Sequence, residues 1–256
     1  MFKIKAFAIR NIKELSRDPL SYIFCLGFPI VMLIIMTLVN NSIPQEAGMT
    51  IYRIDNLAGG IAVFGQTFIM LFTALNITKD RSSAFLVRMY ASPMKSIDFI
   101  GGYILPMVIT AIIQSLISFI ISFIIAIIND FDVSLSGFLL AVATLIPSAV
   151  MFIGLGLLFG TLFNDKSAPG ICSIIISLSS FLGSIFFPAD STGGVLLKIC
   201  KALPFYYCTK SARSAIALEF GFDEFILPLI IVTVCGIAVT IISAVVFRTR
   251  MKADLS

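Results

Sequence analysis

The sequence contains no histidine and no tryptophan, and charged residues make up only 12% of its 256 positions. Without histidine there is no Ser/His catalysis, no imidazole metal ligand and no histidine proton relay. A soluble domain of this length carries about 25% charged residues, so the low charge excludes a soluble enzyme. The net charge of +4 at pH 7 is modest and gives no reason to expect a nucleic-acid partner.

Charge is also missing from the middle of the apolar runs, where gradient-coupled transporters keep ionisable side chains. The sequence has no GxxxxGK(S/T) phosphate-binding loop, and Gly156 and Gly160 instead form the small-xxx-small pattern of close helix packing. We therefore expect no ATP hydrolysis by this chain and no coupling to an ion gradient. A sodium site made of carbonyl groups alone is the open alternative. Energy for active transport must then come from a partner.

What the sequence does contain is long apolar runs, and its mean hydropathy is +1.06. A run of about 20 residues crosses a ~30 Å hydrocarbon core as a helix. The sequence therefore predicts an all-α integral membrane protein with six transmembrane helices, and residues 1–256 form a single domain. The predicted spans are 20–39, 58–78, 100–128, 135–162, 169–189 and 224–247.

The basic residues predict the orientation of these spans. Most of the 18 lysines and arginines lie in segments that share a side with the N-terminus if all six spans cross. The positive-inside rule then places both termini in the cytoplasm, and we expect a multi-pass protein of the bacterial cytoplasmic membrane. Residues 1–19 have apolar residues on one helical side and Lys3, Arg10, Lys13 and Arg17 on the other. They predict an amphipathic interfacial helix lying flat on the cytoplasmic leaflet, with a frayed basic tail as the alternative.

Residues 190–222, before the last span, predict two short amphipathic helices broken at Pro204. Neither is long or apolar enough to span, so we expect an external re-entrant or interfacial hairpin. Cys200 and Cys208 fall in this segment and would form a disulfide in an oxidising compartment, but two cysteines are a weak signal for one.

Uncharged polar residues line up along several spans. Stripes of this kind serve either interhelical hydrogen bonding in a packed bundle or a groove of low polarity for an amphipathic substrate. Both interpretations stay open here. The residues that would line a substrate path are Gln66, Thr73, Asn76, Gln114, Ser118, Ser177 and Ser180.

The polar segment 79–99, KDRSSAFLVRMYASPMKSIDF, lies between the second and third spans. Its apolar residues at helical spacing form one face of a helix that ends near Pro93, because proline disfavours helix in the residue before it. Arg81 and Arg88 give that helix a basic side. An apolar face rimmed by charge is typical of a helix that docks into a groove on a partner. A solvated loop held to lipid headgroups by its cations is the alternative.

The order of these elements resembles the membrane subunit of ABC-2 type exporters over nearly the whole chain. Three local matches carry the resemblance: the segment 79–99 followed by glycines, GSIFFPAD at 183–190, and ALPFYYCTKSARSAI before the last span. The sequence departs from the family pattern at three places. It has Asp80 where the family often has glutamate, Ser82-Ser83 where the family has Gly-Thr, and Gly101-Gly102 where the family has Gly-Lys.

The resemblance implies a non-catalytic permease subunit that holds no cofactor itself, while a partner ATPase subunit binds ATP and Mg. A second permease copy or a related permease, and membrane lipids, are the other implied partners. The cargo would be hydrophobic or amphipathic, such as an antibiotic, peptide or lipid-like compound. A polysaccharide or lipid-linked glycan is the alternative, and a gradient-driven transporter or channel is a further one. The cytoplasmic coupling helix implied by the family would present Asp80, Arg81, Phe85, Leu86, Arg88, Met89, Tyr90 and Pro93 to the ATPase, and Phe186, Phe187 and Pro188 would form the external gate.

Overall fold

A computed structural model describes residues 2–44, 50–83 and 96–253, and every regular element in these ranges is a helix. This confirms the predicted all-α class. Two π-helical turns, Ile23–Gly27 and Phe222–Ile226, lead directly into α3 and α12. The α-helices are α1 (Phe2–Leu15), α2 (Pro19–Tyr22), α3 (Phe28–Ser42), α4 (Ile54–Ser82), α6 (Ser96–Ile128), α7 (Leu135–Leu162), α8 (Ala168–Leu182), α9 (Ala189–Thr192), α10 (Gly194–Ala202), α11 (Pro204–Ala217) and α12 (Leu227–Ala253).

Within the described ranges, five helical segments are long and apolar enough to cross a membrane, one fewer than predicted. The sixth predicted span, 169–189, contains only the 15-residue helix α8. At 1.5 Å per residue α8 is about 22 Å long, short of a ~30 Å hydrocarbon core. It ends because Gly183 leaves the helix and Ser184 adopts a positive φ of 57°. The spanning segments are Pro19–Ser42, Ile54–Ser82, Ser96–Ile128, Leu135–Leu162 and Phe222–Arg250.

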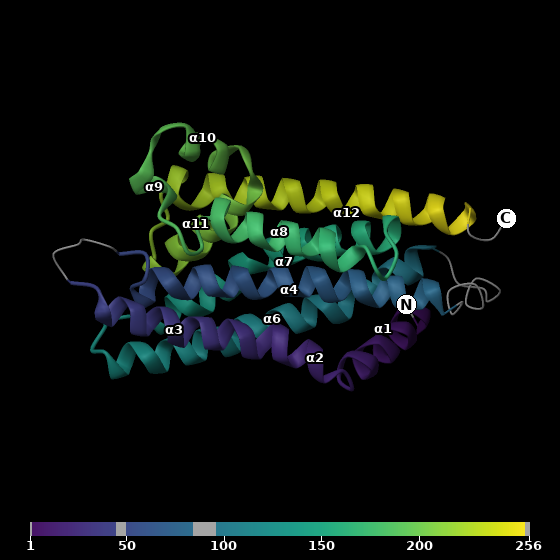
Figure 1. The fold of residues 1–256 in the computed structure, drawn as a ribbon, viewed down its shortest axis with the longest axis horizontal. Helices are drawn as coiled ribbons and strands as arrows, with labels where there is room; N and C mark the ends of the chain where they lie inside the picture. The colour runs from purple at the N-terminus through teal and green to yellow at the C-terminus, as the bar shows by residue number, and fades with distance from the viewer. Residues whose placement is uncertain (1, 45–49, 84–95, 254–256) are drawn as a thin grey trace.

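The helices form an elongated bundle with two distinct ends. Figure 1 shows α1 and the far end of α12 at one end, and the short helices α9 and α10 at the opposite end. We name these the α1 end and the hairpin end. Since the first and last described helices meet at the same end, the chain makes an even number of passes between the ends. α8 therefore completes one pass together with the non-helical residues after it.

α4 is the central helix of the bundle and is buried along nearly its whole length. It packs against α7, α6, α8, α11 and α3, while α12 packs mainly on α7. Close approach of α4 and α7 depends on glycine: a Cβ atom at Gly160 would lie 2.8 Å from the carbonyl oxygen of Ala74 and 2.9 Å from the Cβ of Ile77. The predicted role of the Gly156–Gly160 pattern in helix packing is thus confirmed.

The N-terminal helix forms as predicted, although it ends at Leu15 rather than at residue 19. Part of its apolar side, at Phe7 and Ala8, packs against protein. Phe7 is buried against Phe99 and Tyr103 of α6, with ring centroids 5.6 and 5.0 Å away. Gly102 makes this possible because it leaves the space that the Phe7 ring fills. The apolar side of α1 is thus shared between the bundle, at Phe7, and the exposed surface, at Ile12.

The segment between α8 and α12 also forms the predicted pair of short helices. α10 and α11 are separated at Leu203, and Pro204 begins α11, where its missing N–H is tolerated. All five cysteines, each of which is in the described part of the chain, are free, and Cys200 and Cys208 are buried. The Cys200–Cys208 disulfide is therefore not formed in this structure.

We predict that Gly160→Leu lowers the apparent melting temperature of the detergent-solubilised protein by several degrees. The new side chain overpacks the α4–α7 contact, a change that costs about 1–3 kcal/mol. Gly170→Leu is the matched control, since no atom lies within 4 Å of a Cβ placed there. Circular dichroism at 222 nm during heating measures both, and equal melting temperatures would contradict the packing role of Gly160.

Candidate functional site

The most connected polar group at the α1 end is the carboxylate of Asp80, in the last turn of α4. Arg10 of α1 donates to it twice, from Nη1 to Oδ2 at 2.7 Å and from Nη2 to Oδ1 at 2.8 Å. The hydroxyl of Tyr103 in α6 donates to Oδ2 at 2.7 Å. Asp80 is only 3% exposed. A two-point guanidinium–carboxylate pair of this kind fixes both distance and orientation. The Asp80 carboxylate therefore joins α1, α4 and α6.

Neighbouring side chains hold Arg10 and Tyr103 in place. Asn11 accepts a hydrogen bond from Arg10 Nη1 at 2.8 Å and donates to the carbonyl oxygen of Gly102 at 2.9 Å. The ring of Tyr103 lies between those of Phe7 and Phe247, the latter from α12. We call Arg10, Asp80 and Tyr103 the Asp80 cluster. It therefore gathers α1, α4, α6 and, through aromatic contact, α12.

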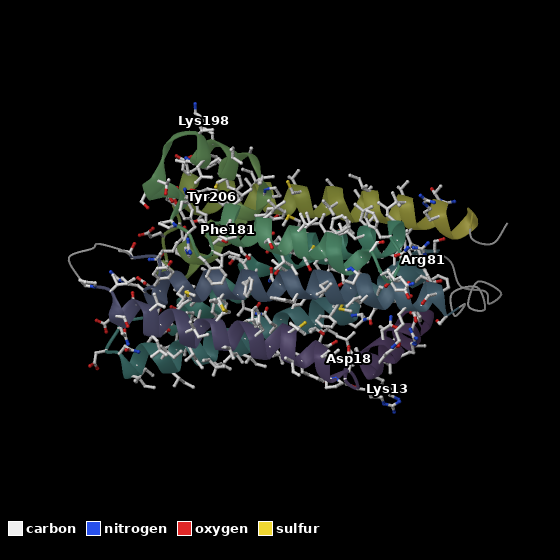
Figure 2. All side chains as sticks on the ribbon, viewed as in Figure 1. Lys13, Asp18, Arg81, Phe181, Lys198 and Tyr206 are labelled. Atoms are coloured by element: carbon white, nitrogen blue, oxygen red, sulfur yellow. The ribbon has the colours of Figure 1, made fainter. Side chains whose placement is uncertain are left out.

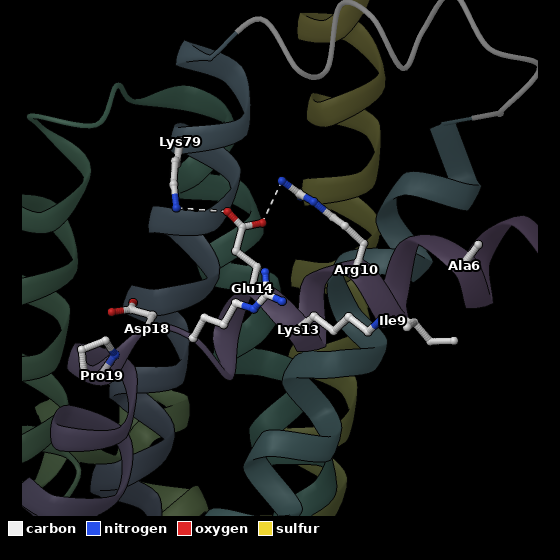
Figure 3. A pocket seen from close by; sticks show the side chains of 9 residues that line it. Ala6, Ile9, Arg10, Lys13, Glu14, Asp18, Pro19 and Lys79 are labelled. Carbon is white, nitrogen blue, oxygen red and sulfur yellow. Dashed lines mark ion pairs between the residues drawn. The ribbon is translucent and has the colours of Figure 1, made fainter.

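Glu14 extends the cluster toward the surface. Figure 3 shows its carboxylate between two cations, with Arg10 Nη2 at 2.7 Å and Lys79 Nζ at 3.0 Å. Burial acts to lower the pKa of Arg10, but the hydrogen bond and charge of Asp80, together with Glu14, outweigh it and raise that pKa. Arg10 is therefore a permanent cation, which keeps a counter-ion beside the buried carboxylate.

Arg81, the next residue of α4, fixes the opposite side of the same helix end. Its Nη1 donates to the carbonyl oxygens of Gly160, Thr161 and Phe163 at 3.1, 2.6 and 3.2 Å. Gly160 and Thr161 belong to the last turn of α7, whose carbonyl groups have no partner within the helix, and Phe163 directly follows it; a cation there is favoured by the helix dipole. The end of α4 is thus attached to α1 and α6 through Asp80 and to α7 through Arg81.

Two of the eight predicted ATPase-contacting residues therefore make their contacts inside this chain. Asp80 and Arg81 belong to the last turn of α4, not to a separate docking helix, and 96–99 of the predicted 79–99 loop belong to α6. Figure 2 shows Arg81 at the α1 end of the bundle, together with Lys13 and Asp18. The other six, Phe85, Leu86, Arg88, Met89, Tyr90 and Pro93, lie outside the described residues.

The predicted substrate-path residues separate into two sets. Gln66 of α4 and Gln114 of α6 are turned into the bundle: Gln66 donates to the Leu145 carbonyl oxygen at 3.1 Å and accepts from Ser148 Oγ at 2.6 Å, and Gln114 donates to Ser118 Oγ at 3.2 Å. The Gln66 contacts join α4 to α7 and fit interhelical hydrogen bonding, whereas the Gln114–Ser118 bond lies within α6.

The remaining members lie differently. Thr73 and Ser180 donate to carbonyl groups of their own helices, at Ile69 and Ile176, and Asn76 is half-buried. On α8, by contrast, Ser177 is exposed, and the adjoining Phe181 is 65% exposed. The exposed side of α8 therefore carries both polar and apolar side chains, on the surface of the chain and not in its interior.

The predicted gate residues lie at the hairpin end. Phe186 packs edge-on against Phe64 of α4, with centroids 5.2 Å apart, and its carbonyl oxygen accepts from the hydroxyl of Tyr52 at 3.2 Å. Phe187 packs beside the buried Tyr206 of the hairpin, while Pro188 precedes α9. The three residues therefore connect α4 to the hairpin helices.

Sequence reasoning missed Arg213 as an organiser of this end. Its Nε donates to the carbonyl oxygen of Asn56 at 2.9 Å and its Nη2 to that of Ile185 at 3.4 Å, which ties α11 to the start of α4 and to the gate segment. Burial lowers the pKa of Arg213 to about 10, so it is still charged at neutral pH. The sequence contained a signal for this role, because Arg213 is a single arginine among the small residues of SARSAIA.

A comparison with protein families adds to this geometry. The ABC-2 type transporter family matches residues 3–217, from α1 to the end of α11. The chain belongs to this family. It is accordingly the membrane-embedded permease subunit of an ABC-type transporter, a multi-pass protein that pairs with an ABC ATPase subunit. A comparison with curated proteins gave no match.

The Asp80 cluster of the permease yields a test by double-mutant cycle. We predict that Arg10→Met and Asp80→Asn each lower the apparent melting temperature. The first leaves the buried Asp80 carboxylate without its counter-charge, and the second removes the two-point ion pair while Arg10 keeps Glu14. The double variant is expected to lower the melting temperature by clearly less than the two single losses added together, because substitutions of residues in direct contact are not additive.

The matched control is the Arg53–Asp55 pair at the hairpin end, whose side chains, 3.1 Å apart, are 47% and 34% exposed. Arg53→Met and Asp55→Asn should have small, additive effects, as surface ion pairs do. Strictly additive losses in the Asp80 cluster, measured by the same thermal scans, would contradict a direct energetic link between α1 and α4.

Proposed function

We propose that the permease is the membrane half of an ATP-driven exporter, assembled as two permease chains with two separate ATPase subunits. The two permease chains are either two copies of this chain or this chain and a related one. ATP and Mg are bound by the ATPase subunits, and the permease supplies the docking segment and the path. The family membership and the attachment of the α4 end by Asp80 and Arg81 support this proposal.

The observation that carries the mechanism is the position of the Asp80 cluster in the chain. The predicted docking residues 85–93 follow α4 directly, and the last turn of α4 is bonded to α1, α6 and α7. A displacement of the docking segment by the ATPase would therefore move these helices together. A flexible attachment at the same place would lose the displacement before it reached the membrane.

The path for cargo is proposed to run between two permease chains and not through one. Polar side chains of α4 take part in the packed interior, as the bond from Ser148 of α7 to Gln66 illustrates. The outer side of α8 instead exposes Ser173 and Ser177 beside Ile174 and Phe181. Such a mixed surface suits a hydrophobic or amphipathic cargo, which would leave past Phe186, Phe187 and Pro188 at the hairpin end.

The α1 end is proposed to face the cytoplasm and the hairpin end the outside. We predict that Lys198→Cys in intact cells is labelled by a membrane-impermeant maleimide, because Lys198 is exposed at the tip of the hairpin (Figure 2). Lys166→Cys, exposed in the turn between α7 and α8, should be labelled only after the cells are opened.

Labelling of the native Cys208 thiol of the hairpin should stay low, since burial raises the pKa of Cys208 to about 12 and leaves almost no thiolate at pH 7. Lys210→Cys should label from outside more slowly than Lys198→Cys, because Lys210 is half-buried and paired with Glu224. Access to position 198 only from the cytoplasm would overturn the orientation.

The docking segment is tested by co-purification of the permease with its ATPase. We predict that Phe85→Ala combined with Arg88→Glu abolishes co-purification and the ATPase stimulation measured in lipid, while the permease keeps its elution profile and helix content. The apolar anchor and its charged rim are both removed. Lys198→Glu, a charge reversal at the other end, is the control that should leave the complex intact. Normal co-purification of the double variant would falsify the docking assignment.

A further inference from the structure

A cavity of about 780 Å³ lies in the angle where α1 turns into the first span (Figure 3). It is bordered by one side of α1, by the turn at Asp18 and Pro19, and by Lys79 at the end of α4. Its lining residues are separate in sequence from the predicted docking residues 85–93, and Arg10 is the member of the Asp80 cluster that borders it. The residues that decide its chemistry are Arg10, Lys13, Glu14, Arg17, Asp18 and Lys79.

The charges around this cavity do not balance. Four cations face two carboxylates, and both carboxylates are already occupied. Glu14 is held by Arg10 and Lys79. Asp18 caps α2, accepting from the backbone N–H of Leu20 at 3.1 Å and from Ser21 Oγ at 2.8 Å. Lys13 and Arg17 make no ion pair with any described residue, so the cavity presents two uncompensated positive charges to an anionic group.

The surface next to these two cations is apolar. On α1, Ile9 and Ile12 are 43% and 39% exposed; at 100° per residue Ile9 lies about 40° from Lys13, and Ile12 lies about 60° beyond Ile9 on its far side. At the start of the first span, Leu20 and Ile23 are each 56% exposed. A ligand that satisfies both surfaces needs a negative headgroup joined to hydrocarbon.

We propose that this cavity binds the headgroup of an anionic phospholipid, with its phosphate held by Lys13 and Arg17 and its acyl chains lying along Ile9, Ile12 and Leu20. Basic residues at the junction of an interfacial helix and a span are a recurrent setting for such headgroups. The apolar rim selects a lipid over a soluble phosphate, which would meet the cations alone. Since Arg10 and Lys79 border the same cavity, the bound lipid lies beside the Asp80 cluster.

The absence of tryptophan allows a direct measurement of binding. Ile12→Trp, outside the cavity lining but beside it, gives the chain a single tryptophan. The protein is reconstituted in phosphatidylcholine containing brominated phosphatidylglycerol, or brominated phosphatidylcholine as the neutral reference, and quenching gives the relative binding constant. We expect phosphatidylglycerol to be preferred by about ten-fold or more, with a loss of about five-fold for each cation removed.

The variants Lys13→Gln, Arg17→Gln and the pair together test the two cations. The matched control is Arg248→Gln with Arg250→Gln, which removes two exposed cations from α12 without touching the cavity. We expect the pair in α1 to lose the preference and the pair in α12 to keep it. Helix content and elution profile confirm folding, and Lys13→Gln alone gives the answer if the pair does not fold.

Three results would overturn the proposal. Equal quenching by the two brominated lipids would remove the headgroup preference. An equal loss from the α12 pair would show attraction by net charge and not a site. Displacement of the brominated lipid by soluble glycerol phosphate, beyond what sodium chloride of equal ionic strength achieves, would assign the site to a free phosphate. The measurement needs no ATPase, so it stands apart from the proposed docking function.

Discussion

A carboxylate that sits almost out of contact with water must keep its counter-charge, and this requirement at Asp80 organises one end of the molecule. Arg10 can reach it only if α1 lies against α6, and α1 can lie there only because Gly102 leaves room for Phe7. Tyr103 contributes the third hydrogen bond from α6 itself. A charge that is expensive to bury thus specifies the relative position of helices whose apolar surfaces alone would pack in many ways.

The class of the protein and most of its segments could be predicted from the sequence, because both depend on local properties. Apolar runs predict spans, and Pro204 predicts the break between α10 and α11, without knowledge of any neighbour. The end of α8 at Leu182 was missed because the apolar run resumes at Ile185, Phe186 and Phe187, although the backbone leaves the helix at Gly183 and Ser184. The length of an apolar run in the sequence therefore does not give the length of the helix that forms there.

The candidate site was less predictable than the fold, since its contacts join residues far apart in the chain. Seventy positions separate Arg10 from Asp80, and nothing in the sequence indicates that this arginine pairs with this aspartate. The polar stripes show the same limit. Spacing placed Gln66 and Ser177 in the same category, yet Gln66 pairs with Ser148 inside the bundle and Ser177 lies on its outside. Only the packing of the helices decides which stripe serves stability and which is left for a partner or cargo.

The shortness of α8 has a consequence for the membrane around it. A helix of about 22 Å cannot match a ~30 Å hydrocarbon layer, and mismatch is relieved by local thinning of the bilayer at a small free-energy change per Å. The missing length falls at the hairpin end, where Ser184 and the polar helix α9 follow. Water and headgroups would reach deeper beside α8 than elsewhere around the bundle. A molecule moving along α8 would then have a shorter hydrophobic distance to travel than the thickness of the membrane suggests.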